Sequence, residues 1–287
     1  MTMKIKKYIS AIIVLTVLLF GAQSCFQDLE NDPAFDYPQG FPDPTGEYKP
    51  EKLNLPFEGN VYDQSTYQFV NSGVGVYSFI DGVKGKAYKG DADTTYVLIN
   101  NHPAISKIVE SEITNLGSFT VSFWMKSSRN TAATGLFSIT NTKTFWSNLD
   151  IFLENTGSET QAFFKVHIYN ERTGSRVEKW VEARVDNVFG DWVHMAFVYD
   201  GTTSTMNIYK DGNSVFQSVI TGLGELQFKD VGPMIIGTFP YQANPSLTSG
   251  ATNQSWAGWY KGALDQFHFY SEPLSGDEVK ELYNSKN

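Results

Sequence analysis

Residues 119–126 read Phe-Thr-Val-Ser-Phe-Trp-Met-Lys, a run with an apolar side chain at every second position. Successive side chains of an extended strand point to opposite faces, so Phe119, Val121, Phe123 and Met125 share one face. This period of two predicts a β-strand with one face in a hydrophobic core.

Similar runs follow at residues 161–169, 177–185, 192–199 and 205–209, separated by clusters of Gly, Asn, Asp and Ser. The dipeptides Asp200-Gly201 and Asp211-Gly212 are typical of turns, because both residue types tolerate positive φ. Aromatic residues make up 15% of the chain and glycines number 24, which favours strands and turns over helices. The predicted fold class is therefore all-β, an antiparallel β-sandwich.

One helix is predicted, at the C-terminal end of the chain. Ser275 and Glu278 have the spacing of a capping box, in which the serine hydroxyl and the glutamate carboxylate satisfy free amides of the first turn. Val279, Leu282 and Tyr283 then fall on one helical face. Residues 108–115 show no sustained alternation and are expected to form a loop.

The N-terminal residues have the layout of a secretory signal peptide, predicted to comprise residues 1–24. A basic head with three lysines precedes an apolar run at 9–20 and a stretch of mostly small residues at 21–24. That run is shorter than the roughly 20 residues that a membrane-spanning helix needs. Cys25 follows and is the chain's single cysteine, so no intramolecular disulfide can form.

Residues 25–50 are predicted to be a tether and residues 51–287 one folded domain. The stretch from 26 to 50 holds five of the eleven prolines, which favours extended conformers. Loss of residues 1–24 removes three lysines and no acidic residue, so the formal charge falls from −9 to −12. A chain this acidic offers no stripe of basic residues that could bind the phosphates of a nucleic acid, which argues against a nucleic-acid partner.

Cys25 and the residues after it resemble the N-terminus of a bacterial lipoprotein. A cysteine at the cleavage point resembles the lipobox cysteine, and the acidic stretch at 26–32 resembles the export signal of Bacteroidetes surface lipoproteins. The resemblance implies lipidation of Cys25 and contact with the membrane through acyl chains alone. It places the protein on the outer membrane, facing the cell exterior.

Seven segments resemble, in order, the laminin-G-like or concanavalin A-like jelly roll. They lie at 55–63, 82–87, 119–124, 191–201 (Asp-Trp-Val-His-Met-Ala-Phe-Val-Tyr-Asp-Gly), 208–212, 260–270 (Tyr-Lys-Gly-Ala-Leu-Asp-Gln-Phe-His-Phe-Tyr) and 274–279. The resemblance implies a jelly roll. That fold hosts lectins, glycan-binding modules, glycosidases and adhesion domains alike, so function depends on the site.

The resemblance also implies a calcium site where the first and last strands meet. The matching residues are Glu58 and Asp265, and carboxylate oxygens are the ligands that calcium prefers. The alternative is that backbone amides satisfy both carboxylates. If calcium binds, its expected role is structural.

Catalytic residues are not evident. Glu178 and Glu182 put two carboxylates on one strand face with Trp180 between them, which weakly resembles the Glu-x-Asp-x-Glu pattern of glycosidases on this fold. The central acid is replaced by Trp180, so a solvent-facing strand is the favoured interpretation. No arrangement of Ser, His and Asp stands out, and the four histidines are scattered, with His194 and His268 interpreted as packing or hydrogen-bonding residues.

Aromatic side chains outside the framework strands are the remaining signal, since sugars stack their C–H faces on indole and phenol rings. These candidates for ligand binding are Trp146, Trp180, Tyr241, Trp256 and Trp259. Residues 241–260 are rich in Asn, Ser, Thr and Gly and are predicted to form a long loop beside a binding face. The alternative is that these rings cover the edge of the sandwich.

Three functions remain open from the sequence. The favoured one is a non-catalytic surface lipoprotein that binds a glycan through the jelly roll. The second is a protein-binding or structural surface module, and the third is a glycosidase that uses Glu178 and Glu182.

Overall fold

The computed structural model describes residues 48–101 and 106–286, which form two β-sheets packed face to face. The predicted signal peptide, Cys25 and most of the tether lie outside the described residues. The first strand, β1, begins at Glu51. Among the described residues, no helix has the length and hydropathy that a membrane-spanning segment requires.

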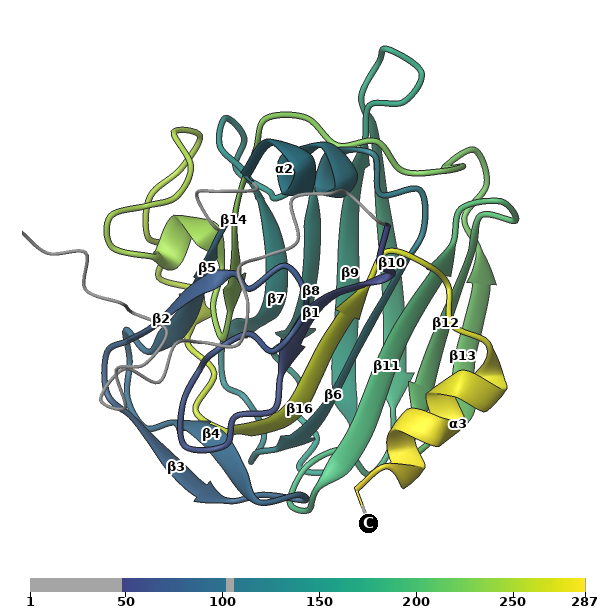
Figure 1. The fold of residues 1–287 in the computed structure, drawn as a ribbon. Coiled ribbons are helices and arrows are strands. Elements are labelled where there is room, and N and C mark those ends of the chain that lie inside the picture. Colours follow the sequence, from purple (N-terminus) through teal and green to yellow (C-terminus); the bar gives the residue numbers. More distant parts are fainter. Residues whose placement is uncertain (1–47, 102–105, 287) are drawn as a thin grey trace, which may run out of the picture. The chain divides into compact units, whose positions relative to one another are not determined.

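The first sheet lies in front in Figure 1. Its strands, in spatial order, are β13 (Asn213–Val219), β12 (Thr205–Lys210), β11 (Val193–Asp200), β6 (Phe119–Lys126), β16 (Ala263–Tyr270), β4 (Lys86–Gly90) and β3 (Tyr77–Asp81), and β1 (Glu51–Leu55) also pairs with β16. All of these pairings are antiparallel, as the sequence predicts.

The second sheet lies behind the first. Its strands, in spatial order, are β10 (Val177–Val185), β9 (Ala162–Asn170), β8 (Leu149–Glu154), β7 (Ala133–Asn141), β14 (Val231–Ile236), β5 (Tyr96–Asn100) and β2 (Val70–Val74). The two-residue strand β15 (Ala257–Gly258) pairs with β7 in parallel.

The core lies between the two sheets and is built from the alternating apolar positions. Phe119, Val121, Phe123 and Met125 are fully buried in it, which confirms the face predicted for this strand. Burial of large apolar side chains at both inner faces is the main stabilising contribution in a sandwich of this kind.

The two turns predicted from the sequence differ in which residue has a positive φ. Asp211 and Gly212 both have positive φ, 51° and 71°, and join β12 to β13 as a two-residue hairpin. In the connection from β11 to β12, residues 201–204 form the predicted turn, and the positive φ lies on Ser204 and not on Gly201. Position 201 requires a glycine for a steric reason, because a Cβ there would lie 2.4 Å from the carbonyl oxygen of Gly117.

Strand β16 contains a bulge that changes which side chains enter the core. Gln266 has a positive φ of 45°, and the pairing with β6 shifts between Asp265 and His268. Leu264 and Phe267 are three positions apart and would face opposite sides of a regular strand, yet both are buried in the core. The extra residue of the bulge makes this possible.

The C-terminal helix α3 (Gly276–Asn284) has the predicted capping box between Ser275 and Glu278. Figure 1 shows α3 over the outer face of the first sheet, beside β12 and β13. Val279 packs there in one cluster with Ala196 and Val198, and Tyr283 stacks on Trp124 with ring centroids 5.4 Å apart.

A second helix, α2 (Ser106–Thr114), forms where the sequence predicts a loop, so that prediction is wrong. A helix this short is marginal on its own, and tertiary contacts stabilise it. The Glu112 carboxylate lies 2.5 Å from the buried Lys52 ammonium and accepts a hydrogen bond from the Tyr67 hydroxyl. Ile113 packs into the main core.

His194 lies buried under the C-terminal residues. Its Nε2 atom lies 2.8 Å from the Ser122 hydroxyl, and its ring packs against Trp124. Burial, helped by the nearby positive charges of His268 and Lys286, lowers the pKa of His194 from 6.5 to about 3. The packing role predicted for this histidine agrees with these contacts.

Acidification is therefore expected to destabilise the domain through His194. Between pH 6.5 and 3 the unfolded chain binds a proton here that the folded domain excludes, so stability falls as the pH falls through this window. At pH 4.5 the loss from this group is about 3 kcal/mol, from roughly 1.36 kcal/mol per pH unit. Urea unfolding of the wild type and His194→Gln at pH 7.5 and 4.5 measures it. An equal acid loss in both proteins would contradict this assignment.

Candidate functional site

The outer face of the second sheet carries a group of aromatic rings from segments far apart in the chain. We call Phe145, Trp146, Trp180, Tyr241 and Trp256 the aromatic surface. Trp180 stands on β10, Phe145 and Trp146 lie in the β7–β8 connection, and Tyr241 lies in the 3-10 helix η2 (Pro240–Gln242). Trp256 directly precedes β15.

Trp146 lies at the centre of the aromatic surface. Its ring centroid is 4.9 Å from that of Trp180, 6.0 Å from that of Trp256 and 6.1 Å from that of Tyr241. Tyr241 in turn stacks on Phe145 at 4.5 Å. Ring contacts of this kind hold the aromatic side chains in fixed orientations.

The structure thus brings together four of the five aromatic residues that the sequence proposes for ligand binding. Trp180 and Trp256 remain 40% and 43% exposed, whereas Tyr241 is buried at 1%. Tyr241 therefore supports the other rings from below, and Trp180 and Trp256 remain accessible to solvent. Trp259 does not join them and packs with Tyr96 and Ile235 in a separate cluster.

Strand register places a polar row directly beneath these rings. Ser138 on β7 pairs with Asp150 on β8, Asp150 pairs with His167 on β9, and His167 pairs with Trp180 on β10. Directly opposite residues on one sheet face have adjacent side chains. The four side chains therefore form a continuous line across four neighbouring strands.

Asp150 holds this row together. Its carboxylate accepts hydrogen bonds from the Ser138 hydroxyl at 2.6 Å and the Ser147 backbone amide at 2.9 Å, and it lies 3.2 Å from Nδ1 of His167. The side chains of Asp150 and His167 are 1% and 0% exposed. Ser138 bonds to the aspartate and not to the histidine, so the group lacks the contact between nucleophile and base that a catalytic triad needs.

Glu178 lies beside the end of this row, on the same face of β10 as Trp180. Its Oε1 atom accepts a hydrogen bond from Nε1 of Trp180 at 3.1 Å and lies 3.3 Å from Nε2 of His167, without hydrogen-bond geometry in the second contact. The Glu178 side chain is 42% exposed. The arrangement places a carboxylate at the edge of an exposed indole, where it can accept hydrogen bonds from a ligand.

Glu178 and Glu182 share the solvent-facing side of β10, as their spacing predicts. Four strand residues separate their Cα atoms by about 13 Å, from a rise of about 3.3 Å per residue. Paired carboxylates of glycosidases lie about 5 to 9.5 Å apart, so the two glutamate side chains would have to turn toward each other. Glu182 is instead turned to Lys165 on β9, with 3.2 Å between the charged groups. This geometry offers no support for a pair of catalytic carboxylates.

Glu58 and Asp265, proposed for calcium, both contact the turn between β3 and β4. Oε2 of Glu58 accepts from the amide of Lys86, and Oδ2 of Asp265 accepts from the amides of Val83 and Lys84. Burial raises the pKa of the Asp265 carboxyl, although the amides oppose the shift. This is the alternative that the sequence leaves open, and calcium binding stays a prediction. The described residues contain no group of three or more His, Cys, Asp or Glu side chains placed to hold a metal ion.

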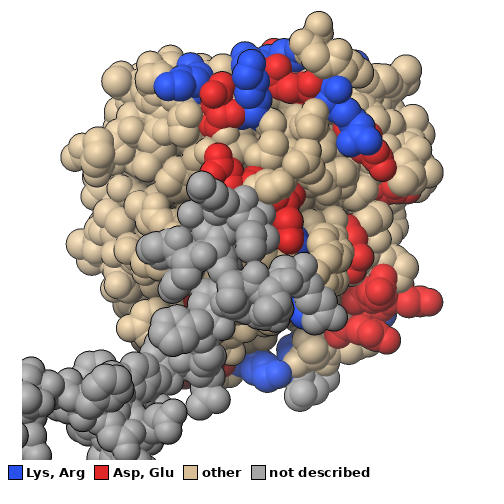
Figure 2. All heavy atoms as spheres, turned by 45° about the horizontal axis from the view of Figure 1, so that its top comes forward, with Lys and Arg blue, Asp and Glu red and all other residues tan. Residues whose placement is uncertain are grey.

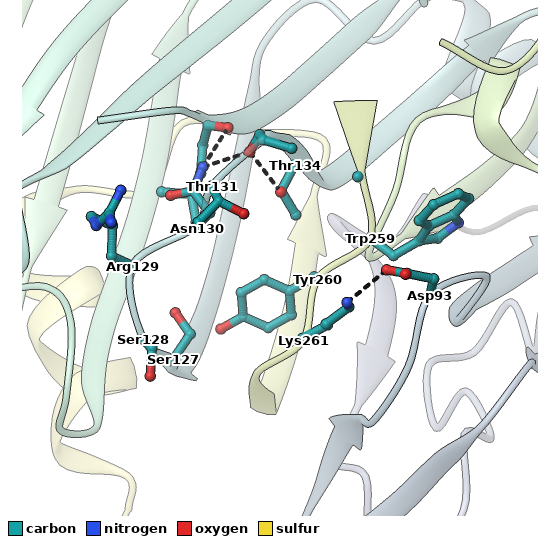
Figure 3. A pocket seen from close by; sticks show the side chains of 13 residues that line it. Asp93, Ser127, Ser128, Arg129, Asn130, Thr131, Thr134, Trp259, Tyr260 and Lys261 are labelled. Carbon is teal, nitrogen blue, oxygen red and sulfur yellow. Dashed lines mark hydrogen bonds and ion pairs between the residues drawn. The ribbon is translucent and has the colours of Figure 1, made fainter. Parts of the chain in front are cut away.

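A separate hollow of about 210 Å³ opens where three connections meet. Residues 127–132 between β6 and β7 form one wall, and residues 258–261 and Asp93 form the other. Figure 3 shows Asn130 and Thr131 on one side, Trp259 and Lys261 on the other, and the ring of Tyr260 between them. Trp259 is the predicted ligand-binding residue that lines this hollow.

Charged side chains of both signs mix on the face at the top of Figure 1. Figure 2 shows Lys and Arg beside Asp and Glu there. Ion pairs among the described residues include Arg172 with Glu225 and Arg176 with Glu171. Surface pairs of this kind contribute little to stability.

Solved structures with the same fold include receptor-binding domains of botulinum neurotoxins. The binding domain of neurotoxin DC, in complex with rat synaptotagmin II, is 15% identical with a TM-score of 0.55, and the match covers 83% of this chain and 52% of that one. Neurotoxin type C, whose cell entry depends on two ganglioside molecules, is 15% identical with a TM-score of 0.56, covering 83% and 51%. The type G receptor-binding domain is 11% identical with a TM-score of 0.56, covering 83% and 52%.

This chain therefore spans about half the length of these structures, and at such low identity they establish the fold alone. A comparison with curated proteins gives no match. A family model described as the concanavalin A-like lectin/glucanases superfamily matches residues 91–280, which is more than half of the chain. With its two antiparallel sheets and C-terminal helix, this chain belongs to the concanavalin A-like lectin/glucanase superfamily.

Proposed function

We propose that this protein is a non-catalytic carbohydrate-binding lipoprotein of the cell surface, and that the aromatic surface is its glycan-binding site. The observation that carries the proposal is the pair of exposed indoles, Trp180 and Trp256, held in one ring cluster on a rigid sheet. Indoles fixed by packing can stack on a sugar ring with little loss of conformational entropy.

The polar groups beside the rings suit a ligand rich in hydroxyl groups. Oε2 of Glu178 has no hydrogen bond to the described residues, so it can accept one from a sugar hydroxyl next to Trp180. The chain's acidic charge is compatible with a neutral glycan. Binding of gangliosides by a neurotoxin of the same fold supports a glycan ligand, although it concerns a different protein.

Display at the cell surface is the other half of the proposal. It rests on the signal-peptide pattern of residues 1–24 and on Cys25, whose lipidation would attach the domain to the outer membrane through the tether. One acyl chain alone binds a membrane only marginally, so the proposal includes acylation of the new N-terminus.

Replacement of either exposed indole is expected to weaken glycan binding about 30-fold or more. Tryptophan side chains at the centre of an interface commonly contribute about 2 kcal/mol or more, which corresponds to that factor. The purified full-length protein is applied to an array of neutral polysaccharides and host-type glycans, in calcium and in EGTA. The best ligand is then titrated against wild type, Trp180→Ala and Trp256→Ala by calorimetry.

The matched control is Tyr62→Ala, which removes an exposed aromatic ring distant in the chain from every segment of the aromatic surface. We expect it to bind as wild type does. Binding unaffected by both tryptophan variants would contradict the proposed site. Absence of binding to every glycan would reject the proposed function and favour a protein partner, while turnover of any glycan would show an enzyme.

A further inference from the structure

The hollow next to Trp259 extends the proposed site. We infer that it binds one uncharged sugar residue at the end of a glycan, while the other sugar residues of that glycan lie on the aromatic surface. This inference rests on the proposed function and specifies which part of the glycan is recognised. Four properties of the hollow carry it: its size, its charge, its hydrogen-bonding groups and its place in the chain.

The size of the hollow limits its occupant. Its volume is about 210 Å³. Pockets that enclose drug-sized molecules usually measure about 300 to 1,000 Å³. The hollow therefore suits a group the size of one sugar ring, and the remainder of a longer ligand would lie outside it.

The charges on its walls are balanced. The Lys261 ammonium lies 2.7 Å from the Asp93 carboxylate, and Nε of Arg129 lies 2.8 Å from the carboxylate of Glu159. Arg129 also donates from Nη1 to a backbone carbonyl. Because each cation already has an anionic partner, the walls offer no unbalanced charge to an ionic ligand, and an uncharged one fits better.

The other polar groups of the lining residues are an amide and an indole N–H, which can form hydrogen bonds with hydroxyl groups. Nδ2 of Asn130 donates to the carbonyls of Ala132 and Leu153, which fixes the amide, while its Oδ1 atom is buried without a hydrogen-bond partner among the described residues (Figure 3). The indole Nε1 of Trp259 is likewise buried and unpartnered within this part of the structure.

A buried polar group without a hydrogen-bond partner destabilises a protein, so both atoms favour a ligand that supplies partners. A hydroxyl group matches both, because it can donate to an amide oxygen and accept from an indole nitrogen. The rings of Trp259 and Tyr260, both lining the hollow, provide apolar area for the C–H face of the same sugar.

Strand β15 joins the hollow to the aromatic surface. Trp256 precedes β15, and Gly258 and Trp259 follow in the wall of the hollow. The strand is anchored at both ends, because the Trp256 carbonyl accepts from the Ala133 amide and the Gly258 carbonyl accepts from the Thr238 hydroxyl. Three residues of extended chain span about 10 Å, so one short glycan can contact Trp256 and enter the hollow.

The test uses the indole N–H signals of the full chain in heteronuclear NMR, with each of the six tryptophans assigned by replacement with Phe. The probes are uncharged monosaccharides: glucose, galactose, mannose, xylose, fucose, N-acetylglucosamine and N-acetylgalactosamine. At least one is expected to shift the Trp259 signal in proportion to its concentration. Thr131→Phe, which fills the hollow from an exposed lining position, should abolish that shift.

The matched control is Thr66→Phe, the same replacement at an exposed position outside the lining, and it should keep the shift. Thr131→Phe should also weaken binding of the best array glycan at least tenfold. Ser128→Phe, at another exposed lining position, repeats the test if Thr131→Phe does not fold.

Two results would overturn the inference. One is that no monosaccharide shifts the Trp259 signal, or that the shift persists in Thr131→Phe. The other is that Thr131→Phe binds the array glycan as tightly as wild type while Trp256→Ala does not, which leaves the proposed function intact. A different result would reject the proposed function itself, namely that the wild-type protein binds no glycan on the array.

Discussion

Asp150→Ala is expected to destabilise the domain by about 3 kcal/mol or more and to disorder the polar row beneath the aromatic surface. The alanine leaves three donors without an acceptor: the Ser138 hydroxyl, the Ser147 amide and Nδ1 of His167. Each such buried group costs about 1–3 kcal/mol. Water cannot easily replace the carboxylate, because the Asp150 and His167 side chains are almost fully buried. Urea unfolding measures the loss as a lower midpoint at an unchanged slope.

Two further variants separate the network from a general loss of acidic charge. Asp150→Asn retains one acceptor oxygen and should lose less stability than Asp150→Ala. Glu182→Gln changes an exposed carboxylate on the same sheet face and should stay within about 0.5 kcal/mol of wild type. If Asp150→Ala unfolded at the same urea concentration as Glu182→Gln, the row would not be a stabilising network.

Phe267→Ala is expected to destabilise the domain by about 3–5 kcal/mol, the range for removal of a fully buried phenylalanine. The Phe267 ring connects the two sheets. It stacks on Phe123 of the first sheet with centroids 5.4 Å apart and contacts Phe137 of the second at 5.6 Å. Removal of the ring therefore leaves a cavity between the layers and breaks two aromatic contacts. Chemical unfolding at neutral pH measures the change.

A graded series tests this assignment. Phe267→Leu keeps most of the buried volume and should lose clearly less stability than Phe267→Ala. Val219→Ala shortens a side chain that is 65% exposed on the edge strand β13 and should have almost no effect. A Phe267→Ala protein as stable as Val219→Ala would mean that the ring does not hold the sheets together.

Much of the fold could be predicted because it depends on local sterics. The period of two identified the core face of β6 and the solvent face of β10, and the predicted boundaries of both strands match the structure. The capping box at Ser275 and the hairpin at Asp211-Gly212 follow equally local rules. The sequence also indicates the bulge at Gln266, because Leu264 and Phe267 would face opposite sides of a regular strand.

The site could be predicted only in part. The sequence picked out the tryptophans and the carboxylates of β10 by residue type, and four of the five aromatic candidates do lie together. The sequence offers His167 only as one of four scattered histidines, at a solvent-facing position of the strand predicted at 161–169, a signal that ordinary exposed residues share. Asp150 lies in β8, a strand that the sequence patterns did not identify.

The class of fold, the strand faces and the residue types available for binding follow from the sequence, because alternation, turns and caps depend on neighbours within a few residues. The tertiary structure alone decided that Ser138, Asp150, His167 and Trp180 form one row, that Trp256 joins Trp146, and that Trp259 lines a different hollow. These placements depend on register and loop packing between segments far apart in the chain. A shift of one residue in any of the strands would turn its side chains to the other face.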